Sequence, residues 1–215
     1  MPRAVSKKSE LTRDRILNAA YGLFIQKGFN ATSMREIVEQ ASITMGGIYN
    51  HYASKEDIWI EVLLTRHPYH RILPLIQTAQ GETTADLVRS AAHLLVNELN
   101  NEPNLMHLMF IEIVEFKSRH IPLIIERAMP EIMRLGPVVA GRAGHLRDIP
   151  LPSLVRAFAG LFFSYYVTGQ LIGERPGIAF NKQVLDEFID LFLFGLLADD
   201  DPARTQPGRP AEEAA

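Results

Sequence analysis

Residues 32–55 read TSMREIVEQASITMGGIYNHYASK, and this stretch decides how the chain folds. Ser33 is followed three residues later by Glu36, the pattern of a capping box, which predicts a short helix. A turn follows, and residues 44–50 predict a second short helix. Ser54 caps a third. Two short helices joined by a tight turn are the layout of a helix-turn-helix that reads DNA.

A packing helix is predicted in front of this pair. Residues 12–27 carry apolar side chains at helical spacing, and Gly28 follows where a helix would end. The apolar stripe consists of Ile16, Ala19, Ala20, Leu23 and Phe24.

Three motifs within residues 11–64 resemble the TetR family of bacterial repressors. The first is F-x-x-x-G-[FY] at residues 24–29, and the second is A-T-[ST]-x-x-x-I at residues 31–37. The third is G-x-[IL]-Y-x-[HY]-[FY]-x-x-K-x-x-[ILW], carried by Gly46, Ile48, Tyr49, His51, Tyr52, Lys55 and Ile58. They occur in order and without a gap, which is far more specific than a lone helix-turn-helix pattern.

The resemblance implies an all-α protein of about nine helices. Capping residues and prolines in the sequence predict where these helices begin and end. A three-helix helix-turn-helix domain is expected at residues 1–66, with the reader helices at about 33–52. A helical-bundle domain for ligand binding and dimerisation is expected at residues 67–198. Residues 199–215 are polar and Pro-rich, which predicts a disordered tail.

Composition agrees with this reading. The chain has 215 residues, of which 47% are apolar, enough for one sizeable core or two small ones. It has no cysteine, so neither a disulfide framework nor thiol chemistry is expected. No apolar signal segment or membrane-spanning run is visible, so we expect no membrane partner and a cytoplasmic location.

Charge is unevenly distributed. The net charge is −3, but residues 1–35 carry +5 and the remainder carries −8. A basic end can meet phosphate while the acidic remainder stays away from it. Arg3, Lys7 and Lys8 allow two interpretations: a solvated tail, or an arm that touches phosphate or the minor groove.

Ten residues are candidates for DNA contact. The phosphate candidates are Thr32, Ser33, Gly46, Tyr49, His51 and Lys55, and the base-edge candidates are Thr44, Met45, Gly47 and Asn50. Tyr49 has packing as its alternative role, and Tyr52 is expected to pack. Many family members have lysine where this chain has Met45, so one phosphate-binding cation is missing.

The two C-terminal helices, predicted at residues 152–173 and 181–198, are apolar nearly all the way round. A helix needs one apolar stripe to pack on its own domain, so two stripes imply two partners. A second subunit gives an isologous homodimer, and a central helix of a monomer is the alternative. The interface candidates are Leu154, Phe158, Leu161, Tyr165, Val184, Phe188, Leu191 and Phe192.

The resemblance also implies an inducer pocket inside the C-terminal bundle. Its candidate lining residues, each of which has plain core packing as the alternative, are His93, Met106, Met109, Phe110, Phe116, Phe162, Phe163 and Tyr166. Methionine and aromatic side chains suit a small hydrophobic inducer. No cofactor and no metal are expected, because His67 and His70 lack a third ligand.

The resemblance implies a ligand-responsive DNA-binding regulator, a repressor that a small hydrophobic inducer releases from a near-palindromic operator. An activator, or a helical dimer that only binds partners and takes no inducer, is the alternative. An enzyme is not expected, since the chain has no G-x-S-x-G, no phosphate loop and no H-E-x-x-H.

Overall fold

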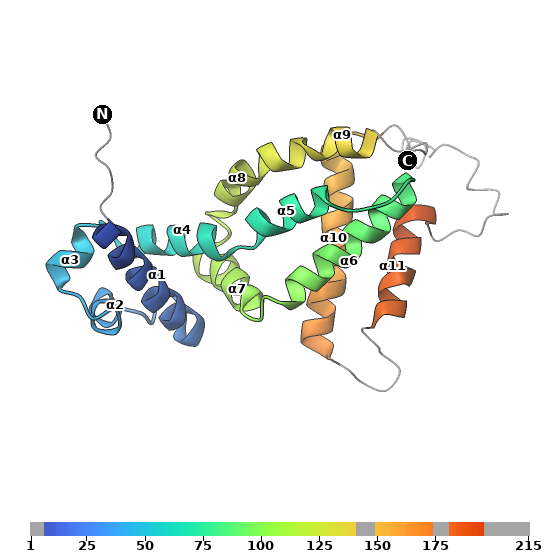
Figure 1. The fold of residues 1–215 in the computed structure, drawn as a ribbon. Coiled ribbons are helices and arrows are strands. Elements are labelled where there is room, and N and C mark those ends of the chain that lie inside the picture. The colour runs from blue at the N-terminus through green and yellow to red at the C-terminus, as the bar shows by residue number, and fades with distance from the viewer. Residues whose placement is uncertain (1–6, 141–148, 174–180, 196–215) are drawn as a thin grey trace, which may run out of the picture. The chain divides into compact units, whose positions relative to one another are not determined.

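The computed structural model describes residues 7–140, 149–173 and 181–195, and the helices in this part of the chain run from α1 to α11 (Figure 1). The all-helical prediction is confirmed. The bounds are α1 Lys7–Lys27, α2 Met34–Gln40, α3 Met45–Tyr49, α4 Lys55–Arg66, α5 Tyr69–Gln77, α6 Thr84–Asn100, α7 Leu105–Phe116, α8 Ile121–Met133, α9 Leu135–Ala140, α10 Leu151–Ile172 and α11 Lys182–Phe194. Arg3 and the tail expected at residues 199–215 lie outside the described residues.

The number of helices exceeds the expected nine because two long segments are divided. The first divides at Pro68, between α4 and α5, where proline supplies no backbone N–H. The second divides at Arg134, between α8 and α9, whereas Pro130 lies inside α8 without ending it.

The caps of the reader helices form as the sequence predicts. The Ser33 hydroxyl accepts from the Glu36 N–H, and the Glu36 carboxylate accepts from the Ser33 N–H at 2.8 Å, which completes the capping box of α2. Ser54 caps α4 in the same way. Gly28 ends α1 with a φ of 86°, a left-handed conformation that favours glycine.

The chain divides into two compact units. The first contains Met1–Thr78 and Asn97–Gly136, and the second contains Ala79–Val96 and Pro137–Ala215. The compact units therefore do not divide at residue 66, where a domain boundary was expected. Helices α7 and α8 belong to the first unit, because Leu108, Ile111 and Ile124 enter the same hydrophobic core as α1 to α4; this unit is called the head below.

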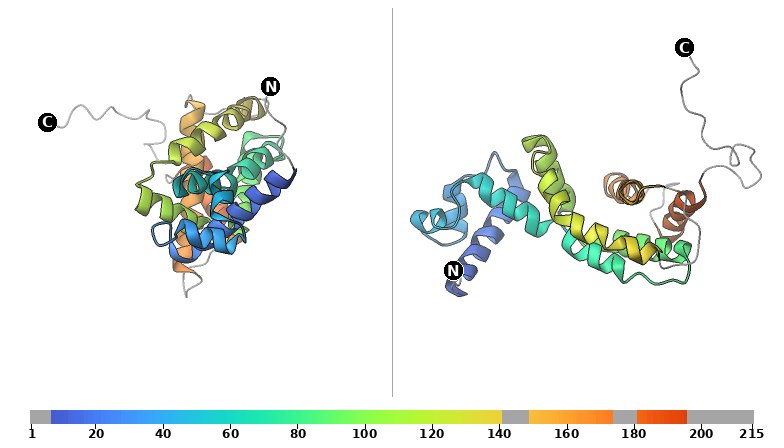
Figure 2. Two further views of the ribbon diagram at one scale, coloured as in Figure 1. Left: turned by 90° about the vertical axis from the view of Figure 1, so that its left-hand side faces the viewer. Right: turned by 90° about the horizontal axis from the view of Figure 1, so that it is seen from above.

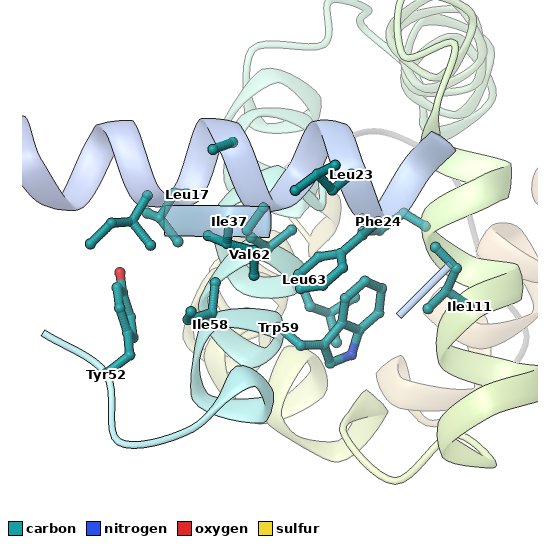
Figure 3. Packing of buried hydrophobic residues seen from close by; sticks show 14 of the residues in the cluster. Leu17, Leu23, Phe24, Ile37, Tyr52, Ile58, Trp59, Val62, Leu63 and Ile111 are labelled. Atoms are coloured by element: carbon teal, nitrogen blue, oxygen red, sulfur yellow. The ribbon is translucent and has the colours of Figure 1, made fainter. Parts of the chain in front are cut away.

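Trp59 of α4 is at the centre of the first unit and has no exposed surface. Its ring lies 5.5 Å from the ring of Phe24 on α1 and 5.4 Å from the ring of Phe116 on α7. Figure 3 shows Trp59 beside Phe24, with Ile111 reaching in from α7. One aromatic side chain thus joins three helices.

Glu115 of α7 connects the same unit to the loop after α1. Its carboxylate accepts hydrogen bonds from the backbone N–H of Phe29 at 3.0 Å and of Asn30 at 2.6 Å. A Cβ at Gly28 would lie 2.8 Å from Oε1 of Glu115. Glycine at position 28 is therefore required both by its φ and by this close approach.

In the second unit α10 and α11 lie side by side (Figures 1 and 2). Phe158 and Phe162 of α10 meet Phe192 of α11, with ring centroids 5.7 and 6.1 Å away. Helix α6 joins this pair through two ion pairs: Arg89 pairs with Asp190, and His93 Nε2 lies 2.8 Å from Asp186.

Among the described residues, no helix is both long enough and apolar enough to cross a membrane.

We expect Gly28→Ala to lower the free energy of unfolding by about 2 kcal/mol, because it combines a left-handed φ with a displaced Glu115 carboxylate. Gly22→Ala is the matched control. Gly22 lies on an exposed face of α1 with open space around it, so alanine should add up to about 1 kcal/mol through helix propensity. Urea unfolding of the two variants measures both effects, and equal stabilities would contradict this account.

Candidate nucleic-acid interface

Helix α3 exposes the residues that the sequence offered as base readers. Ile48 is fully buried, which fixes the rotation of this five-residue helix in the head. Thr44, Met45 and Asn50 are exposed as a result, and Tyr49 is 55% exposed. Four of the candidates in and beside α3 therefore lie outside the core and face solvent.

The two glycines of α3 differ in what the fold requires of them. A Cβ at Gly47 would lie 3.1 Å from Oγ1 of Thr44, the atom that accepts from the Gly47 N–H to cap the helix. A Cβ at Gly46 would meet nothing within 4 Å. Gly47 therefore serves the cap rather than base reading, whereas nothing inside the protein requires a glycine at position 46.

His51 and Tyr52 follow α3 and have different surroundings. Tyr52 is buried, and its hydroxyl donates to Oε2 of Glu61 at 2.9 Å, so its packing role is confirmed. Burial raises the pKa of this phenol. His51 is half-buried, and its ring lies 6.4 Å from that of Tyr52.

Thr32 and Lys55 are placed differently from the expectation. The Thr32 side chain is buried, and its hydroxyl donates to the carbonyl of Gly28 at 2.8 Å. Lys55 Nζ donates to the carbonyls of Phe29 and Thr32 and lies 4.1 Å from the centroid of the Phe29 ring. In this DNA-free structure both polar groups bind the protein's own backbone, and their contact with phosphate stays a prediction. Burial lowers the pKa of the Lys55 ammonium.

Ser33 remains exposed, although its hydroxyl and its N–H both take part in the capping box. Its partner Glu36 also pairs with Lys27. The hydrogen bond with Lys27 is the largest cause that lowers the pKa of the Glu36 carboxyl to about 2, and the hydrogen bonds with Ser33 lower it further. Glu36 therefore stays ionised and holds the first turn of α2 in place.

Several cations of the basic N-terminal region form ion pairs or hydrogen bonds within the first unit. Arg13 Nε pairs with Glu61 at 2.6 Å, and Arg15 donates to the backbone carbonyls of Ala41 and Ser42 at the helix-turn-helix turn. Arg35 of α2 is exposed instead. The charge of +5 in residues 1–35 therefore overstates what this face can offer to phosphate.

Four of the predicted dimer residues contact each other within the chain. Phe158 meets Phe192, and the rings of Tyr165 and Phe188 lie 5.2 Å apart. These four side chains therefore contact one another between α10 and α11, and their place in a subunit interface stays a prediction. Leu154, Leu161 and Val184 are half-buried, and Leu191 is exposed.

The eight candidates for a ligand pocket are divided equally between the two units. Phe116 belongs to the aromatic core of the first unit, and Phe162 is fully buried between Phe158 and Phe192, so both are core residues. His93 pairs with Asp186. Tyr166 is buried with its ring 6.2 Å from that of the exposed Phe163. In the first unit, Met106 and Met109 are half-buried and Phe110 is exposed.

Sequence reasoning missed Glu112, Glu115 and His120, which bind the head from α7 and from the residue before α8. One signal was available: Glu112 and Glu115 are the two charged residues in the otherwise apolar run LMFIEIVEF. A charge that is buried with an apolar helix needs a partner inside the protein. Within the described residues, no cluster of three or more histidine, aspartate or glutamate side chains could hold a metal.

Comparisons with known proteins agree with this geometry. Residues 16–62 match the family described as bacterial regulatory proteins, tetR family. An HTH-type transcriptional regulator of Bacillus subtilis, YvkB, is 26% identical over 197 residues, covering 87% of this chain and 98% of YvkB. The HTH-type transcriptional regulator AcrR of Shigella flexneri is 39% identical over 62 residues, 29% of each chain.

The fold also matches a solved structure. The transcriptional regulator FadR from Bacillus subtilis, in complex with stearoyl-CoA, aligns with a TM-score of 0.63 at 16% identity, covering 86% of this chain and 99% of that chain. At this identity the likeness shows the fold alone.

We expect Lys55→Met to destabilise the head by about 2 kcal/mol, because it removes hydrogen bonds donated by a charged group. It should leave the salt dependence of DNA binding unchanged. Arg35→Gln should do the reverse: stability is kept, and the slope of log affinity against log salt falls by about 0.9 if Arg35 meets one phosphate. Urea unfolding and fluorescence anisotropy at several salt concentrations separate the two roles. A reduced slope in Lys55→Met would refute the structural role given to Lys55.

Proposed function

The chain belongs to the tetR family of bacterial regulatory proteins and is a helix-turn-helix transcriptional regulator, and from this premise we propose that it is a homodimeric repressor. In this proposal a small hydrophobic inducer releases it from a near-palindromic operator. The activator and the interaction-only dimer are the competing possibilities.

The outward surface of α3 carries the proposal. Thr44, Met45 and Asn50 project from it with polar and methyl groups that suit base edges: an asparagine amide matches adenine, and methyl groups match thymine. Tyr49 and His51 supply donors for phosphate. Gly46 allows the helix backbone to approach the DNA backbone closely, because no side chain covers it.

A single head of this size makes few base contacts, so a second copy is needed for selectivity. Two heads related by a two-fold axis fit half-sites about one helical turn apart. We propose that the copies meet through the exposed face of α10, where small residues leave room for a partner helix. This face contains Ala157, Gly160, Phe163 and Ser164, and α11 adds Leu191.

The proposed inducer is apolar for two reasons. Met106, Met109 and Phe110 give α7 flexible and aromatic apolar side chains, which suit a greasy ligand. FadR, which has the same fold, binds stearoyl-CoA in its structure. Inducer and operator must weaken each other by the same factor, since binding couplings are reciprocal.

An electrophoretic shift with the DNA upstream of the chain's own gene tests the proposal. We expect a shift that weakens as salt rises, because phosphate contacts release counterions. If the folded protein shifted none of this DNA at any salt concentration, the interaction-only alternative would be favoured.

Gly46→Ala tests the α3 surface itself. Alanine should leave stability unchanged or raise it by up to about 1 kcal/mol, because a Cβ at position 46 meets no protein atom. Operator affinity should nevertheless fall about tenfold, or about 1.4 kcal/mol, where the new methyl group meets the DNA backbone. Gly22→Ala, in open space on α1, is the control that should keep full affinity.

Gly160→Arg tests the dimer face. A Cβ at Gly160 meets nothing within 4 Å in the chain, so the arginine is tolerated by the subunit but should block a partner. Analytical ultracentrifugation should then report the 24.2 kDa subunit rather than the dimer. Gly22→Arg makes the same change on another exposed helix and should remain dimeric. A dimeric Gly160→Arg would move the interface to a different face.

A further inference from the structure

Glu112 of α7 is a fully buried carboxylate that connects three elements. Its Oε2 accepts from Nε1 of Trp59 on α4 at 2.8 Å, and its Oε1 accepts from the backbone N–H of His120, at the start of α8, at 2.7 Å. A buried carboxylate costs several kcal/mol unless it is paired with a cation and hydrogen-bonded. The two N–H donors satisfy hydrogen bonds, but neither is a cation.

His120 is the residue placed to supply that positive charge. It is buried, its Nδ1 lies 3.0 Å from Oε2 of Glu112, and its Nε2 lies 3.2 Å from Oε1 of Glu56 on α4. A neutral imidazole has one N–H and can donate to only one of these carboxylates, leaving a lone pair directed at the other. Only an imidazolium, protonated on both nitrogens, donates to both.

The other charged groups around His120 do not replace this proton. Arg119 Nη2 donates to Oε1 of Glu56 at 2.5 Å, but it is largely exposed, and no contact joins it to Glu112. On α4, Lys55 is directed at the carbonyls of Phe29 and Thr32. On α7, Glu115 is directed at the loop after α1.

We propose that the second proton on His120 is a latch that ties the first turn of α4 to α7 and α8, so that operator binding is linked to pH. The proposal rests on the proposed DNA-binding function. Lys55 and Glu56 are adjacent: the first binds the loop that precedes α2, and the second binds His120. On its buried side, the first turn of α4 therefore joins the helix-turn-helix to α8 through the Nε2 proton of His120.

Loss of that proton breaks the latch on one side only. His120 keeps its Nδ1–H for the buried Glu112, whereas its Nε2 now presents a lone pair to Glu56. Glu56 is 41% exposed and keeps Arg119 as a partner, so it can turn away from His120 without burying an unpaired charge. The first turn of α4 is then held to the segment before α8 only by the exposed ion pair with Arg119, while the core around Trp59 stays intact.

The first experiment needs no DNA. Nitrogen-15 NMR of the histidine rings, recorded between about pH 6 and pH 9 with His120 assigned by His120→Asn, should find a state with both ring nitrogens protonated and the loss of one proton as the pH rises. Trp59 is the one tryptophan of the chain, so intrinsic fluorescence should follow the same change. His67 does not interfere, because burial lowers its pKa to about 4. A single protonated nitrogen on His120 throughout this range would overturn the latch.

The second experiment measures operator affinity by anisotropy across the same pH range at constant ionic strength. We expect the operator affinity of the native chain to change by about fivefold or more across this pH range, which is the low end of typical couplings between two sites. His120→Asn should abolish this change, and Glu56→Gln should reduce it. His107→Asn, an exposed histidine on α7, is the matched control and should behave like the native chain.

The outcomes separate the latch from the proposed function. Tight operator binding with the same pH response in all four proteins would overturn the latch and leave the DNA-binding function standing. No binding at any pH would overturn that function and the operator linkage together, while the NMR result still reports the proton. Glu56→Gln keeps the test valid if His120→Asn fails to fold, because Glu56 lies outside the core.

Discussion

The contact of Trp59 with the rings of Phe24 and Phe116 is the interaction on which the head depends. It joins α1, α4 and α7 in one buried cluster, and the indole N–H is directed at Glu112, so apolar burial and a charge-assisted hydrogen bond fix the same side chain. Because α4 begins directly after the reader, the position of Trp59 also sets where α2 and α3 are held.

Most polar groups around this cluster bind other parts of the protein, and a different set of groups is exposed to solvent. Arg15, Lys27 and Lys55 all bind inside the protein, two of them to backbone carbonyls that no side chain could otherwise satisfy. The same division separates Gly47, which protects a helix cap, from Gly46, which the fold leaves uncovered.

The sequence was sufficient where the determining interactions are local. Capping at Ser33 and Ser54 joins atoms three residues apart, so the motif and the geometry nearly coincide. It was insufficient for Lys55, whose partners lie 23 and 26 residues away, and for the apolar stripe of α10, which suits α11 as well as another subunit. Periodicity identifies a buried face but not the helix that covers it.

A reader surface with few outward cations changes how affinity is obtained. Met45 gives α3 no positive charge, and the inward-facing cations cannot be recruited without breaking their contacts within the protein. Weak electrostatics lower non-specific binding along with specific binding, so the ratio between them depends on shape and on base contacts. In the proposed dimer, affinity then comes from two heads acting together, which makes their spacing decisive. The first turn of α4, held between the carbonyls of Phe29 and Thr32 and the ring of His120, is therefore where a small displacement has the largest effect on binding.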